Sequence, residues 1–130
     1  MLKVLRVVAG VLASLLLGVL VGLLGSFQHQ SDWTVGGQRI AIGMFAGIAA
    51  LVLAQFVARD AVPFGIGPGL VLLAWVVVVA VFGTSRPEGD LVVPAGLEGQ
   101  GFLYGGFLLG IVVAATLAIS GASGAARARR

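Results

Sequence analysis

The residues of this chain that could bind a metal ion or catalyse proton transfer are few and scattered. The candidates are a single histidine and four acids, His29, Asp32, Glu88, Asp90 and Glu98. Carboxylates suit hard cations and imidazole suits transition metals, but these spacings match no ligand motif with a known mechanism. The chain also has no cysteine, which excludes disulfides, thiol catalysis and cysteine-ligated metals. We therefore expect no enzymatic activity, no metal site and no cofactor.

The densest polar segment is a short stretch that contains Arg86, Glu88 and Asp90. Pro87 fixes one backbone angle and Gly89 permits a positive φ, so the stretch is predicted to be a defined turn that presents the arginine against the two acids. Two interpretations stay open. The turn is a partner-binding site, or it is a solvated turn, since exposed ion pairs contribute less than about 1 kcal/mol.

Four apolar runs make up most of the chain, and none of them contains a charged residue. They cover about 7–27, 40–57, 63–82 and 102–119, and the composition is 59% hydrophobic and 10% charged with a mean hydropathy of +1.12. Soluble proteins are about a quarter charged. At about 1.5 Å per residue, an 18-residue run covers about 27 Å, close to the roughly 30 Å of a hydrocarbon core.

Lipid offers no hydrogen-bond partner to a free backbone group, so such runs must be helices. The sequence thus predicts an all-α polytopic membrane protein: one transmembrane domain, residues 1–130, forming an antiparallel bundle of four transmembrane helices. Residues 28–39 form the first outer loop and 83–101 the longest. The first run is interpreted as a retained anchor, because its apolar part is too long for a signal-peptide core and no clean cleavage site follows it.

The basic residues give the orientation, because Lys and Arg near span ends resist translocation. With four spans, one side of the membrane holds Lys3, Arg6, Arg59, Arg127, Arg129 and Arg130, and the other holds Arg39 and Arg86. Both termini are therefore expected in the cytoplasm, in a bacterial inner membrane. A basic balance of this origin indicates attraction to anionic lipid and not binding of nucleic acid.

Small residues recur at intervals of four in three of the runs. They are Ser14, Gly18 and Gly22 in the first, Gly43 and Gly47 in the second, and Gly106 and Gly110 in the fourth. Because such spacing lets helix backbones approach closely, these three helices are predicted to form the tight contacts. The stripes either pack the monomer or form the seam of a homo-oligomer.

The third run is bulky and β-branched and lacks a small-residue stripe, so it is the candidate to face lipid or a larger partner protein. A helix that began at Pro68 would be short for a span, which favours a start near Pro63.

Polar residues inside the runs are few. Ser14, Thr116 and Ser120 are expected to bond to a preceding backbone carbonyl, and Gln55 is expected to cap or bond locally near the cytoplasmic surface.

The order of the four runs, the Arg86-Pro87-Glu88-Gly89-Asp90 stretch and the glycine-bearing last run resemble an uncharacterised family of small actinobacterial integral membrane proteins. The resemblance implies no activity and no cofactor.

We expect an accessory or scaffold subunit that docks onto a larger membrane or cell-envelope partner through the third helix and the outer turn. The alternative is a small dimeric permease or channel for an ion or small solute. Proton-coupled export requires a titratable group within the path, and the runs contain no carboxylate.

Overall fold

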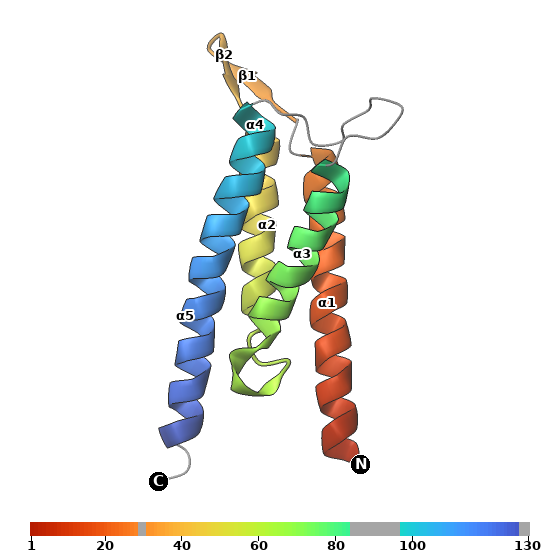
Figure 1. Ribbon diagram of the computed structural model, residues 1–130. Coiled ribbons are helices and arrows are strands. Elements are labelled where there is room, and N and C mark those ends of the chain that lie inside the picture. Colours follow the sequence, from red (N-terminus) through yellow and green to blue (C-terminus); the bar gives the residue numbers. More distant parts are fainter. Residues whose placement is uncertain (29–30, 84–96, 128–130) are drawn as a thin grey trace.

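The structure is a computed structural model that describes residues 1–28, 31–83 and 97–127. Its elements are α1 (Leu2–Gln28), the strands β1 (Trp33–Val35) and β2 (Gln38–Ile40), α2 (Ile42–Ala58), a 3-10 turn (Pro63–Gly65), α3 (Gly67–Gly83), the short α4 (Leu97–Gln100), a π-helical turn (Gly101–Gly105) and α5 (Gly106–Arg127). The last three follow one another without a break and appear as a single rod in Figure 1. The predicted helical class is confirmed for these residues.

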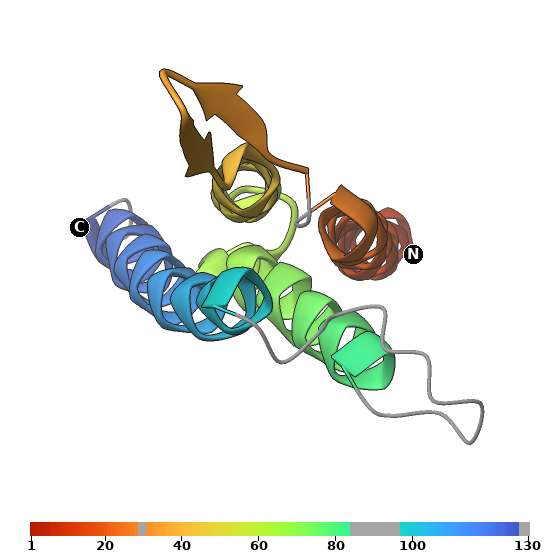
Figure 2. The ribbon, with the colours of Figure 1, turned by 90° about the horizontal axis from the view of Figure 1, so that it is seen from above.

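Helix α3 lies at the centre of the bundle. It packs against α1, α2 and α5, and Figure 2 shows it running obliquely between α1 and α5 with α2 on one side. Val71, Trp75 and Val79 recur every four residues on its inner face and are each at most 1% exposed. The core also contains Leu51 of α2 and Phe102 of the π turn.

The expectation that the third helix faces lipid or a partner is thus wrong for its inner face. Its inner face fills the core, while Leu73, Val77 and Val81 are exposed on the other side. The physical reason is that a stripe of small residues need not meet another such stripe. The small residues of α1 accept the bulky side chains of α3, so one stripe is enough for close packing.

The predicted first outer loop, 28–39, overlaps an antiparallel hairpin of β1 and β2. Trp33 pairs with Ile40, and the chain reverses at Gly36 and Gly37, whose φ angles are 59° and 83°. Successive residues at positive φ are the requirement of a type I′ turn, which suits the twist of a hairpin and strongly favours glycine. Ile40, predicted to begin the second helix, belongs to the hairpin, and α2 begins at Ile42.

The third helix begins at Gly67 and not near Pro63. Pro63 opens the 3-10 turn, and Phe64 and Gly65 then take left-handed φ values of 62° and 67°, which no α-helix accommodates. Pro68 follows in the first turn of α3, where the amide hydrogen that proline lacks has no intrahelical partner in any case.

Candidate functional site

The residues predicted to bind a partner, Arg86, Glu88 and Asp90, lie outside the described residues. The residues predicted to pack helices can all be placed. On α1, Ser14 is buried, Gly18 lies against the backbone of Val71 and the side chain of Ala74, and a Cβ built on Gly22 would be 2.9 Å from Cβ of Val78. This face of α1 therefore packs against α3.

The glycines of α2 and α5 face other parts of the same chain. Gly43 lies against the carbonyl oxygen of Gln28. A Cβ built on Gly47 would lie 2.7 Å from the ring of Phe102. A Cβ built on Gly106 would lie 2.7 Å from the indole of Trp75. A Cβ built on Gly110 would lie 2.6 Å from the side chain of Leu72. A methyl group at any of these positions would force a neighbour to move.

Gln55 joins three helices. Its side chain is fully buried, and Nε2 donates to the carbonyl oxygen of Gly110 on α5 at 2.9 Å and, at a longer 3.4 Å, to that of Pro68 on α3. The prediction that Gln55 caps or bonds locally is wrong. Gly110 explains the difference, because without a side chain α5 comes close to α2: a Cβ there would be 3.3 Å from Leu51, one turn before Gln55.

The hydroxyl groups behave as predicted. Ser14, Thr116 and Ser120 each donate at 2.8 Å to the carbonyl oxygen four residues earlier. Their hydrogen-bonding needs are met within their own helices.

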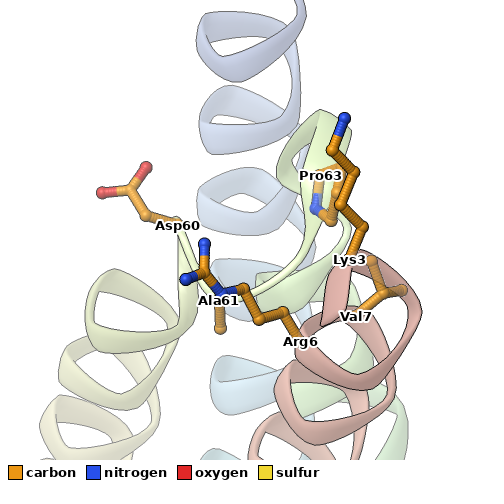
Figure 3. A pocket seen from close by; sticks show the side chains of 6 residues that line it. All are labelled: Lys3, Arg6, Val7, Asp60, Ala61 and Pro63. Carbon is orange, nitrogen blue, oxygen red and sulfur yellow. The ribbon is translucent and has the colours of Figure 1, made fainter. Parts of the chain in front are cut away.

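A cavity of about 380 Å³ lies where α1 begins and where α2 turns into α3. It is lined by Lys3, Arg6, Val7, Asp60, Ala61 and Pro63, and is shown in Figure 3. We refer to it as the basic pocket.

The charges of the basic pocket are arranged asymmetrically. Lys3 and Arg6 reach toward the α2–α3 turn from the first turns of α1, whereas the carboxylate of Asp60 points away from both of them (Figure 3). Asp60 is paired with Arg59, whose Nε lies 3.4 Å from Oδ2. Within the described part of the chain, Lys3 and Arg6 have no acidic partner.

Gly10 brings the two sides of the basic pocket together, because it lies directly against the carbonyl oxygen of Ala61. Sequence reasoning used Lys3 and Arg6 only to orient the chain and did not find the pocket. A signal for it was present, since Gly10 extends the four-residue repeat of Ser14, Gly18 and Gly22 toward the N-terminus.

A second cavity, of about 280 Å³, is apolar and lies between α3 and α5. Its lining consists of Trp75, Val76, Val79, Ala80, Leu103, Tyr104 and Phe107. We refer to it as the α3/α5 groove.

Fold and site define a small helical protein, and within its described residues two helices, Leu2–Gln28 and Gly101–Ser123, are long and apolar enough to cross a membrane. The chain belongs to a family of unknown function (DUF6113), whose sequence model matches residues 2–130. This agrees with the expected membership of an uncharacterised family. No curated protein and no solved structure matches the chain.

Proposed function

We propose that this protein is a four-span protein of a bacterial inner membrane, of actinobacterial origin, that acts as an accessory subunit of a larger membrane protein. Only 28% and 17% of the most apolar windows of the two long helices are buried inside the protein, which leaves an apolar surface for lipid or protein to cover. Helices α2 and α3 have 17 residues each, about 26 Å of helix, and complete the proposed set of spans.

The proposed orientation puts both termini in the cytoplasm. Figure 1 shows the N-terminus, the C-terminal end of α5 and the α2–α3 turn at one end of the bundle and the hairpin at the other. The first end carries Lys3, Arg6 and Arg59. This distribution supports a cytoplasmic assignment for that end by the preference of basic residues for the cytoplasmic side.

Because the chain has no natural cysteine, single cysteines can test this orientation directly. Thr34→Cys, in the hairpin, should react with a membrane-impermeant maleimide on intact cells. Asp60→Cys, in the α2–α3 turn, should react only after the membrane is permeabilised. The reverse pattern would overturn the orientation, and labelling of both on intact cells would overturn the multi-span arrangement.

The observation that carries the accessory role is the contrast between the interior and the α3/α5 groove. In the described helices, the buried polar side chains are Ser14, Ser26 and Gln55, and no charged residue is buried. The part of the interior formed by these described helices thus lacks the titratable relay of a coupled transporter. The groove, in contrast, is apolar and aromatic with the small Ala80 on one wall, which suits a transmembrane helix of the partner.

Crosslinking in native membranes tests the docking. A photoreactive residue at Ala80 should give one defined adduct with a larger membrane protein. The same residue at Ala49, an exposed alanine of α2, serves as the matched control and should not. Adducts between copies of this chain would indicate a homo-oligomer instead. Selective ion or solute flux through liposomes that contain only the pure protein would favour the permease alternative over the accessory role.

A further inference from the structure

The basic pocket lies between the first turns of α1 and the α2–α3 turn, at the end of the bundle where α1 and α5 project beyond that turn. Gly10 of α1 meets Ala61 of the α2–α3 turn, and Gly121 of α5 lies 3.3–3.4 Å, measured from a Cβ built on it, from backbone atoms of Gly65. Residues 2–9 of α1 and 122–127 of α5 therefore extend beyond the turn, by about 12 Å and 9 Å at 1.5 Å per residue. Figure 1 shows both ends reaching past the turn.

The wall of the basic pocket formed by α1 combines two cations with apolar side chains. Lys3 and Arg6 are three residues apart and therefore share a helix face. Around them Leu2, Val4, Leu5 and Val8 are exposed, and on the turn Phe64 and Ile66 are exposed as well. A soluble anion would be bound by the two positive charges alone. A lipid would also place its glycerol group and upper acyl chain against the exposed apolar side chains.

We propose that the basic pocket binds the phosphate group of an anionic phospholipid. Arg6 can bind a phosphate through two parallel N–H donors, and Lys3 adds a second positive charge. Asp60 lines the same cavity, but Arg59 neutralises it and its carboxylate points outward. The inference rests on the membrane insertion proposed above and is independent of the accessory role.

Native mass spectrometry of the full chain, with phosphatidylglycerol and phosphatidylcholine of matched acyl chains, tests the proposal. Each basic residue near a membrane surface contributes about 1 kcal/mol to the attraction of anionic lipid, which corresponds to a roughly fivefold change in affinity. Arg6→Gln and Lys3→Gln should each lower the preference for phosphatidylglycerol about fivefold. Asp60→Asn should raise it.

The control compares Arg59→Gln with Arg6→Gln in the Asp60→Asn background, where loss of Arg59 frees no acid beside the pocket. In that background Arg59→Gln is matched, because it removes the same charge at the same end but from a residue that does not line the pocket. It should change the preference less than twofold. Equal losses for Arg59→Gln and Arg6→Gln would mean diffuse attraction and would overturn the proposal.

Two further arms distinguish other sources of the anion. Displacement of the lipid by equimolar inorganic phosphate would assign the pocket to free phosphate, and displacement by an acidic peptide would assign it to a protein segment. Either result would overturn the lipid assignment. Failure of the chain to insert into lipid nanodiscs would instead contradict the membrane proposal itself, so the two failures are distinguishable.

Discussion

The ring of Phe102 meets the indole of Trp75 edge-on, with ring centroids 5.4 Å apart and ring planes at 66°. The outer edge of Phe102 occupies the space left by two glycines. A Cβ would lie 2.6 Å from this ring if built on Gly25 of α1, and 2.7 Å if built on Gly47 of α2. This one side chain of the π turn therefore contacts the three other long helices and closes the bundle at the end that carries the hairpin.

Truncation of Phe102 should be among the most damaging changes in the chain. Phe102→Ala removes a fully buried ring and leaves a cavity, at an expected cost of about 3–5 kcal/mol in the free energy of unfolding. Phe107→Ala, at a position 40% exposed on the same helix, should cost much less. Reversible unfolding in mixed detergent micelles measures both. Similar losses for the two variants would contradict the closing role of Phe102.

Gly18→Ala should weaken the contact between α1 and α3. A methyl group there would collide with the backbone of Val71, which cannot rotate away, so we expect a loss of about 2 kcal/mol or more. Gly69→Ala is the matched control, since beyond the adjacent backbone of its own helix nothing lies within 4 Å of its added Cβ. Helix propensity should make this variant neutral or stabilising by up to about 1 kcal/mol. Thermal unfolding of the two proteins side by side would show opposite signs, and a harmless Gly18→Ala would disprove the close approach.

Substitutions at Gln55 should separate a lost hydrogen bond from a buried charge. Gln55→Leu keeps the volume and removes the donors to Gly110 and Pro68, for a cost near the roughly 0.6 kcal/mol typical of hydrogen bonds within membranes. Gln55→Glu replaces the amide donors by a carboxyl group, which must either bury a negative charge against two carbonyl oxygens or take up a proton. At neutral pH it should cost about 3 kcal/mol. In micelles, the wild-type protein should be the most stable, Gln55→Leu less stable and Gln55→Glu the least stable. The reverse order of the two variants would contradict the burial of Gln55 between α2, α3 and α5.

Phe64 offers a test in which the usual preference for alanine over glycine should be inverted. Its φ of 62° is left-handed, a conformation that costs a side-chain-bearing residue about 1–2 kcal/mol and costs glycine little. Phe64→Gly and Phe64→Ala both remove the exposed ring, so their difference isolates the backbone. The glycine variant should be more stable by about 1 kcal/mol in thermal unfolding. An alanine variant of equal or greater stability would show that the turn does not hold this angle.

The sequence predicted where the long helices lie along the chain better than it predicted which helices pack against one another. Hydropathy located the four long helices, because an uninterrupted apolar run without charge has few alternatives to a helix. It could not assign α3 to the centre, since Val71 and Val77 are chemically identical and only the packing of α1 makes one buried and the other exposed. The start of α3 depended on the left-handed turn at Phe64, a residue type that gives no such signal.

In the candidate sites, too, local contacts could be predicted from the sequence and long-range contacts could not. The hydroxyl-to-carbonyl bonds of Ser14 and Thr116 were predictable because they are local. The bond of Gln55 to Gly110 spans 55 residues and depends on how closely two helices approach. The basic pocket joins Arg6 to Ala61 through a contact of Gly10, so it exists only once the helices are assembled.

The unequal helix lengths have a consequence for the surrounding lipid. Helices α2 and α3 reach about 26 Å, whereas the 27 residues of α1 reach about 40 Å. Under the proposed four-span arrangement, α2 and α3 are short for a hydrocarbon layer of roughly 30 Å. The apolar residues 7–27 of α1 cover about 31 Å and match that layer, and Lys3 and Arg6 lie beyond them. Lipid must therefore thin beside α2 and α3, so the protein should prefer thinner bilayers and gather where the membrane is already compressed.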